Sequence, residues 1–161
     1  MAKEEKKQLS IILFSGDMDK AMAAFTVACA AAGRGYIVSI FFTFWGISLL
    51  RRERGRGKGF LETMFKLLLP VGPGKTGISK MNFCGFGGVL MRRLIKERGT
   101  QNLHDLMKLA MERRINFIAC EASMKILGLN TSELLDYELL TKGTAETFLQ
   151  KAEKSKIQLF V

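Results

Sequence analysis

Hydrophobic residues gather in short continuous runs along the chain, separated by stretches of helical character. The first run is Leu9–Phe14, and similar runs occur at Tyr36–Phe44, Ile115–Ala119 and Ile157–Val161. Short apolar runs rich in β-branched and aromatic residues are typical of parallel strands that are covered on both faces. We predict a strand at each run and a further short strand near Tyr137–Leu140.

The stretches between these runs favour helices. Met18–Ala32 is rich in helix-forming apolar residues, with Asp17 placed to cap its start and Gly33 to end it. Helical periodicity returns at Val89–Arg98 and at Leu103–Met111. Two more helices are expected, one directly after Cys120 and one from Thr144 to Lys154.

The alternation of strands and helices predicts an α/β fold with a doubly wound, mostly parallel sheet of roughly five strands. Functional loops of such a sheet gather at the carboxyl ends of its strands. We therefore expect Ser15-Gly16-Asp17, Trp45-Gly46 and Cys120 to converge on one edge.

Residues 51–80 interrupt the alternation. They begin with a basic glycine-rich loop, continue through an apolar helical stretch at 60–69, and contain both prolines of the chain. This segment has too few apolar residues for a core of its own, so we expect an insertion that folds over the sheet. The predicted organisation is a charged tail at 1–7 and a single domain at 8–161.

The formal net charge of +10 would attract an acidic protein surface, an anionic lipid or a nucleic acid. Much of the local excess lies at Arg51–Lys58, which lacks the interleaved aromatic residues of a base-stacking surface. We expect no nucleic acid partner. The basic segment is interpreted either as a solvated loop or as a patch that docks an acidic partner.

Tyr36–Leu50 carries no charge, which raises the question of a membrane segment. The stretch is shorter than the roughly 20 apolar residues of a spanning helix, and Gly33-Arg34-Gly35 prevents its extension backward. We predict a buried strand that runs into a short helix. Peripheral membrane contact is kept as the less favoured alternative, because a basic run follows.

The N-terminal residues lack the apolar core of a signal peptide. The three cysteines, Cys29, Cys84 and Cys120, are widely spaced and form no C-x-x-C pair, so neither a disulfide framework nor a zinc site is indicated. A reducing cytoplasm is the compartment that fits this pattern.

Cys120 lies where an apolar run meets a predicted helix start. A thiol in this position faces unpaired backbone N–H groups and the positive end of the helix dipole, and both favour the thiolate. Cys120 is therefore a candidate reactive sulfur, with a small buried apolar residue as the alternative. Cys84, in a predicted loop, is a candidate second thiol or a packing residue, and Cys29 is expected to pack inside a helix.

Other candidate residues give weaker signals. The amides of Ser15 and Gly16 could hold an anion, but the loop lacks the glycine-rich phosphate motifs and Asp17 would repel a phosphate. His104 is the only histidine and is expected at the surface. Trp45 is interpreted as the wall of a pocket or as part of a subunit contact. Several methionines are interpreted as core filling or as an adaptable apolar surface, namely Met81, Met91, Met107, Met111 and Met124.

Several segments, in their order along the chain, carry a family resemblance. They are Phe14–Ala21, Phe41–Gly46, Ser79–Phe83, Phe117–Cys120, Ser123-Met124 and Leu127-Gly128. With these segments the chain resembles the DsrE/DsrF/DsrH-like sulfur-relay family, most closely the DsrE-like branch often labelled peroxiredoxin-family. The resemblance covers nearly the whole chain after the charged N-terminus.

The resemblance implies a flavodoxin-like three-layer α/β/α sandwich, a homo-oligomer, and a cysteine that carries sulfane sulfur as a persulfide. The matching cysteine is Cys120. The leading hypothesis is that Cys120 exchanges sulfur with a small sulfur-carrier protein or a rhodanese-like donor, without a metal or another cofactor. Ser123 would hydrogen-bond the sulfur, and Trp45 and Met124 would shield it from water.

Two other classes of function remain open at this point. The first is a nucleotide- or flavin-binding module with Ser15 and Gly16 near a phosphate. The second is a non-catalytic adaptor at the membrane periphery, in which Cys120 is inert.

Overall fold

The protein is described by a computed structural model that covers residues 7–52, 69–79 and 86–161. These residues form a five-stranded sheet with the strand order β4-β3-β2-β1-β5, and every neighbouring pair is parallel. The predicted α/β fold with a parallel sheet is confirmed. The strands are β1 (Gln8–Leu13), β2 (Ile37–Phe42), β3 (Asn116–Cys120), β4 (Leu140–Gly143) and β5 (Ile157–Phe160).

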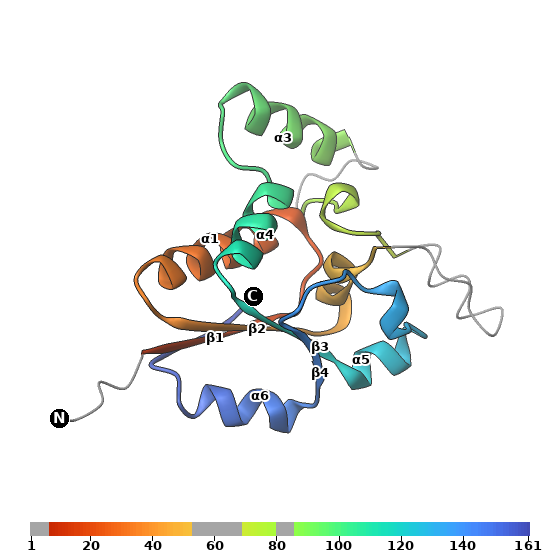
Figure 1. The fold of residues 1–161 in the computed structure, drawn as a ribbon. Helices are drawn as coiled ribbons and strands as arrows, with labels where there is room; N and C mark the ends of the chain where they lie inside the picture. Colours follow the sequence, from red (N-terminus) through yellow and green to blue (C-terminus); the bar gives the residue numbers. More distant parts are fainter. Residues whose placement is uncertain (1–6, 53–68, 80–85) are drawn as a thin grey trace.

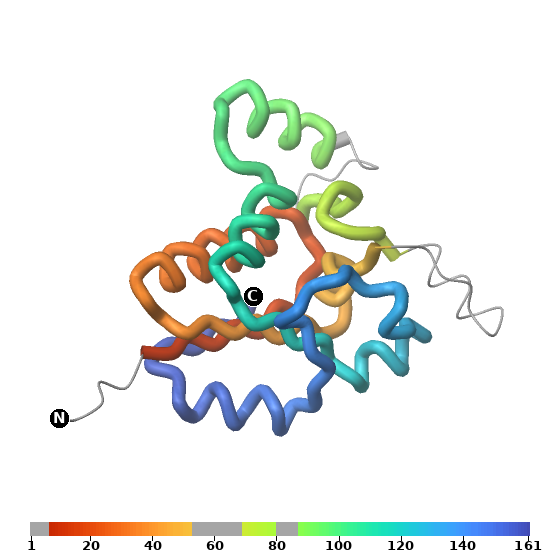
Figure 2. The backbone as a smooth tube through the Cα atoms, viewed as in Figure 1, coloured from red at the N-terminus to blue at the C-terminus, as the bar shows by residue number. Residues whose placement is uncertain are grey.

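Helices cover both faces of the sheet and make the fold three-layered (Figure 1). The helices α1 (Met18–Gly33) and α4 (Leu103–Glu112) pack together on one face, and α6 (Ala145–Ala152) covers the other. The helix α3 (Phe86–Glu97) stands beyond α4, away from the sheet (Figure 2). The remaining elements are α5 (Glu121–Ile126) and the 3-10 turns η1 (Phe44–Leu50), η2 (Pro73–Lys75) and η4 (Thr131–Glu133).

The alternation of side chains along each strand sorts the core into two clusters. Phe42 and Phe117 face α1, where their rings lie 6.2 and 5.9 Å from the ring of Phe25. On the other face, Phe41 lies 5.5 Å from Phe148 of α6, in a small cluster that also contains Cys120. Because successive side chains of β3 point to opposite faces of the sheet, the side chain of Cys120 lies on the α6 face.

The uncharged stretch at Tyr36–Leu50 forms β2 and then η1, as predicted. Within the three ranges that the structure covers, no helix has the length and apolar character needed to cross a membrane.

Two elements begin three residues away from their predicted starts. The strand expected near Tyr137–Leu140 is β4, which runs from Leu140 to Gly143. Tyr137 instead starts a turn closed by the N–H of Leu140, and its hydroxyl donates to the carbonyl of Ile115 at 2.8 Å. The helix expected at Val89–Arg98 begins at Phe86, three residues early.

The structure also changes the interpretation of the basic segment and of Asp17. The side chain of Arg51 is fully buried, donates to the carbonyl of Leu69 at 3.2 Å and pairs with Glu133 at 3.8 Å, so Arg51 is neither solvated nor free to dock a partner. Positions 53–58 and the helix expected at 60–69, apart from Leu69, lie outside the described residues. Asp17 holds the N-cap position of α1, but its carboxylate accepts from Ser15 and Lys20 and makes no capping bond.

The start of α4 offers a test of local stability. Asn102 is its N-cap, and the side-chain oxygen of Asn102 accepts a hydrogen bond from the N–H of Asp105 at 3.0 Å. We expect Asn102→Ala to lower the free energy of unfolding by about 1 kcal/mol, because that N–H loses its partner. Urea denaturation would measure the loss, with the exposed neighbour Gln101→Ala as the matched control. Equal midpoints for the two variants would contradict this role of Asn102.

Candidate functional site

The loops after β1, β2 and β3 meet at one edge of the sheet, as the sequence predicts. The N–H of Thr43 donates to the carbonyl of Leu13 at 3.1 Å, and the N–H of Gly46 donates to the carbonyl of Phe14 at 2.8 Å. The hydroxyl oxygens of Thr43 and Ser123 lie 3.0 Å apart, which joins the end of β2 to α5. This edge therefore brings residues from three loops next to the end of β3.

Cys120 is the last residue of β3 and the N-cap of α5. Its side chain packs among Phe41, Ile118 and Phe148 on the α6 face. Cys120 is 7% exposed, whereas Phe117, Ile118 and Ala119 before it are 0% exposed. The thiol thus lies at the boundary where the buried strand reaches the edge of the sheet.

The surroundings of Cys120 favour its thiolate. Burial raises the pKa of the Cys120 thiol, but the nearby hydroxyl and N–H of Ser123, the hydroxyl of Thr43 and the N–H of Ala122 favour the thiolate, outweigh burial and hold this pKa below its ordinary value. These donors come from the first turn of α5 and from the end of β2. The expected favourable helix start is present, and side-chain hydroxyls strengthen it.

A second layer of contacts positions the hydroxyls. The oxygen of Ser123, which is 1% exposed, accepts a hydrogen bond from the N–H of Phe44 at 2.9 Å. The hydroxyl proton of Ser123 can then be donated to the hydroxyl oxygen of Thr43, which lies 3.0 Å away, or to the sulfur of Cys120. Phe44 has a φ of 43°, a left-handed conformation that is uncommon for a bulky residue. The bond to Ser123 holds this strained turn against the candidate site.

The contribution of Ser123 can be measured through the reactivity of the thiol. A thiolate reacts with iodoacetamide and a thiol does not, so the rate rises as pH passes upward through the pKa of Cys120. We expect Ser123→Ala to move the midpoint of this pH profile upward and to slow alkylation at neutral pH by about three- to tenfold, because the thiolate loses a donor.

The control for this experiment is Ser132→Ala, since Ser132 is an exposed serine of η4. Peptide-resolved mass spectrometry would report the rate at Cys120 alone. An unchanged midpoint in Ser123→Ala, or an equal shift in Ser132→Ala, would contradict the assigned role of Ser123.

Thr43 is not singled out by the sequence pattern. It lies in the apolar run Tyr36–Phe44, which predicts a strand, and in the segment Phe41–Gly46, which carries the family resemblance. A signal was nevertheless present, because Thr43 is the polar residue at the end of a buried strand, where functional loops of a parallel sheet begin.

The other predicted site residues do not all lie beside Cys120. Trp45 is 46% exposed and neighbours the strained turn. Met124 is buried in the larger core cluster, not in the cluster that contains Cys120. Ser15 donates its hydroxyl to Asp17 at 2.8 Å, and Gly16 lies against the carbonyl of Trp45. Together, Ser15, Gly16 and Trp45 line a cavity of about 380 Å³ at the end of β1.

Of the two remaining cysteines, the structure describes Cys29 and not Cys84. Cys29 is 3% exposed inside α1, where burial raises the pKa of its thiol more than the charge of Arg113 lowers it. Its sulfur donates to the carbonyl of Leu106 at 3.6 Å, so the predicted packing role is confirmed. Cys84 lies outside the described residues. Among the residues that are described, no group of three or more His, Cys, Asp and Glu side chains could hold a metal ion.

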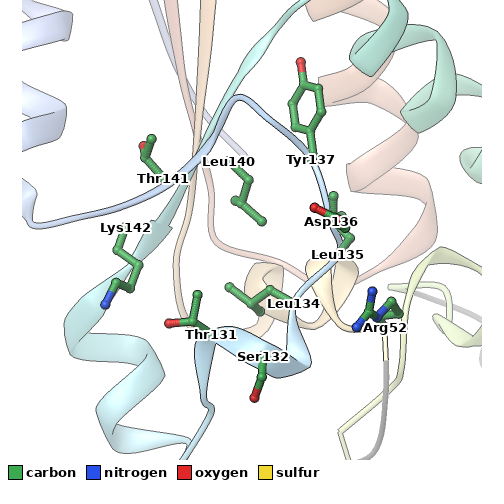
Figure 3. A pocket seen from close by; sticks show the side chains of 10 residues that line it. All are labelled: Arg52, Thr131, Ser132, Leu134, Leu135, Asp136, Tyr137, Leu140, Thr141 and Lys142. Carbon is green, nitrogen blue, oxygen red and sulfur yellow. The ribbon is translucent and has the colours of Figure 1, made fainter.

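A cavity of about 410 Å³ lies beside β4 (Figure 3). Arg52 stands at one side of it, and Thr141 and Lys142 of β4 stand at the other. Cys120 is not among its lining residues, although its neighbour in the sheet, Gly143, directly follows Lys142. This cavity is therefore separate from the thiol.

Exposed aromatic side chains surround the ends of β1, β2 and β5. The ring of Phe14 lies 5.2 Å from that of Phe44 and 6.1 Å from that of Phe160. Phe160 is 70% exposed, and Phe44 is 41% exposed. Grouped apolar side chains of this kind mark surfaces that contact other molecules. Phe44 links this surface directly to Ser123.

The chain is similar to known proteins over nearly its whole length. The model of the DsrE/DsrF/DrsH-like family matches residues 5–160. The uncharacterized protein YrkE of Bacillus subtilis (strain 168) is 42% identical over 160 residues, which cover 98% of this chain and 99% of that protein. The sulfur carrier protein DsrE2 of Allochromatium vinosum is 28% identical over 161 residues, with the same coverage of both chains.

Among solved structures, the ychN protein from E. coli has a similar fold. Its crystal structure aligns with a TM-score of 0.58 and 10% sequence identity, and the alignment covers 96% of this chain and 99% of that one. At this identity the likeness concerns the fold alone.

Proposed function

The chain belongs to the DsrE/DsrF/DrsH-like family, and from this premise we propose that it is a sulfur carrier that holds sulfane sulfur as a persulfide on Cys120. The observation that carries the proposal is the thiol at the end of β3, whose pKa is lowered by donors from Ser123, Thr43 and Ala122. The name of the relative DsrE2, a sulfur carrier protein, supports the same role. The family suggests a place in a sulfur relay.

The proposed chemistry needs only one thiolate and a sulfane donor. The Cys120 thiolate attacks a terminal sulfur of a polysulfide or of a donor protein's persulfide, and a new S–S bond forms as the donor's S–S bond breaks. The electron pair of the broken bond leaves on the shortened donor. In the second step an acceptor thiolate attacks the outer sulfur, and the Cys120 thiolate is released. Neither step requires an external oxidant or reductant.

The donors that favour the thiolate would also stabilise the persulfide anion before transfer. Ser123 and Thr43 would hydrogen-bond the charged sulfur, and the first turn of α5 would face it with N–H groups. Trp45, at the neighbouring turn, would limit access of water from the outer side. Met124, which packs in the other core cluster, would support α5 rather than cover the sulfur.

The proposed partners are proteins that supply or accept sulfur, either a small sulfur-carrier protein or a rhodanese-like donor. The exposed aromatic surface of Phe14, Phe44 and Phe160 supports a protein contact next to the thiol. We propose further that residues 8–161 act as one domain, that the protein is a homo-oligomer, and that it works in the reducing cytoplasm. Cys29 and Cys120 are both free thiols, in keeping with that compartment.

A two-stage transfer experiment tests the function. The reduced protein is loaded with a slight excess of polysulfide, freed of small molecules, and then mixed with a small protein that bears one accessible cysteine. We expect intact-mass spectrometry to show about 32 Da, one sulfur, gained by the chain in the first stage and by the acceptor in the second. Loading without later transfer would contradict the role of carrier, and absence of loading would contradict the persulfide itself.

A further inference from the structure

A separate cavity of about 400 Å³ lies against α4, on the face of the sheet opposite to the Cys120 side chain. One wall is a single face of α4, because His104, Met107, Lys108 and Met111 follow the i, i+3, i+4, i+7 spacing of a helix. The facing wall comes from η1, η2 and the segment after η4, through Leu49, Pro73 and Leu135.

Backbone hydrogen bonds hold these walls in place. The N–H of Leu135 donates to the carbonyl of Leu50 at 2.7 Å, and the N–H of Gly72, next to η2, donates to the carbonyl of Ser48 at 3.1 Å. The hydroxyl of Tyr137 donates to the carbonyl of Ile115 at 2.8 Å, which ties the segment after η4 to the chain that follows α4. The cavity is thus formed without a ligand, as small-molecule sites usually are.

The lining combines an apolar interior with basic groups. Leu49 and Met107 are buried, and Met111 and Leu135 are partly buried, so a bound molecule would meet mostly hydrocarbon and thioether surface. Lys108, Arg51 and Arg52 add three positive charges, of which Arg51 is paired with Glu133 at 3.8 Å, and His104 stands beside Lys108 on the α4 wall. The described lining residues include no carboxylate. Asp105 lies 4.0 Å from His104, and Glu133 lies 3.8 Å from Arg51, but neither is part of the lining.

We propose that this cavity binds an amphipathic carboxylate, with its hydrocarbon chain between Met107, Met111 and Leu135 and its carboxylate at Lys108. The volume falls within the range of small-molecule sites, about 300–1,000 Å³. The two methionines suit a flexible aliphatic chain, because the unbranched thioether adapts its shape to what it contacts. The inference does not depend on sulfur transfer, since no lining residue belongs to the Cys120 site.

Octanoate, used well below the concentration at which it forms micelles, is the probe. We expect saturable binding of one octanoate per chain in isothermal titration calorimetry, and weaker binding of the uncharged octanol. In methyl NMR spectra the signals of Met107 and Met111 should shift during the titration, while that of Met124 in α5 stays in place. Absence of saturable binding would overturn the proposal, and so would equal affinities for octanoate and octanol.

Charge reversal at Lys108 locates the carboxylate. Lys108 is exposed, so Lys108→Glu should fold normally, and we expect it to weaken octanoate binding roughly tenfold or more. The matched control is Lys154→Glu, an exposed lysine after α6 on the other side of the sheet, which should bind octanoate as the unmodified chain does. An equal loss in both variants would show a general effect of net charge and would overturn the assigned site.

Discussion

Replacing Cys120 with serine is expected to abolish sulfur loading of the protein. Exposure to polysulfide should add about 32 Da to the unmodified chain and nothing to Cys120→Ser, because a serine hydroxyl stays protonated and forms no persulfide. The expected effect is a complete loss of loading. Intact-mass spectrometry after a short exposure measures it directly.

The chain provides its own controls for this experiment. Cys29→Ser should load fully, because Cys29 is buried inside α1 and burial raises the pKa of its thiol. Cys84→Ser decides whether the second candidate thiol takes part, and the proposal expects it to load fully as well. Sulfur that persists in Cys120→Ser and disappears in Cys84→Ser would move the carrier site to Cys84.

Gly46→Ala is expected to produce the largest loss of stability. A Cβ at Gly46 would overlap the carbonyl oxygen of Leu13 and lie 2.9 Å from the carbonyl carbon of Leu13. Both are backbone atoms of β1, so the overlap can be removed only if the strand or the turn moves. We expect a loss of roughly 3 kcal/mol in the free energy of unfolding, measured by urea denaturation.

A second glycine serves as the matched control, because it distinguishes the contact between Gly46 and Leu13 from the general effect of adding a methyl group. A Cβ at Gly74 in η2 would have no neighbouring atom within 4 Å, so Gly74→Ala should leave stability within about 0.5 kcal/mol of the unmodified protein. Gly46→Ala should also slow alkylation of Cys120, because the turn from Thr43 to Gly46 carries the hydroxyl that reaches the sulfur. A Gly46→Ala variant as stable as Gly74→Ala would contradict the packing described for this turn.

The sequence pattern predicted the sheet, and also the relation between Cys120 and Ser123, because both depend on local periodicity. Apolar runs marked β1, β2, β3 and β5. Ser123 lies within the first turn of the helix that Cys120 caps, so its closeness to the sulfur follows from helix geometry. The convergence of the loops follows from the parallel arrangement of the strands.

Contacts between distant segments could not be predicted in this way. Thr43 reaches Cys120 only because the end of β2 lies beside α5, and Arg51 is buried only because Glu133 meets it across the fold. The edge strand β4 was misplaced because its residues, such as Thr141 and Lys142, are polar and exposed and lack a strand pattern. Its position is set by pairing with β3, which the sequence of β4 does not display.

Sulfur transfer at Cys120 requires a thiolate that reagents can reach, and the two buried cysteines of the described chain allow a comparison within one molecule. Native protein is treated with iodoacetamide at several pH values, and alkylation of Cys120 and Cys29 is followed on separate peptides. We expect Cys120 to react faster than Cys29 and its pH midpoint to lie below that of an ordinary cysteine. A Cys120 as unreactive as Cys29 across this range, becoming reactive only on unfolding, would contradict the proposed persulfide site.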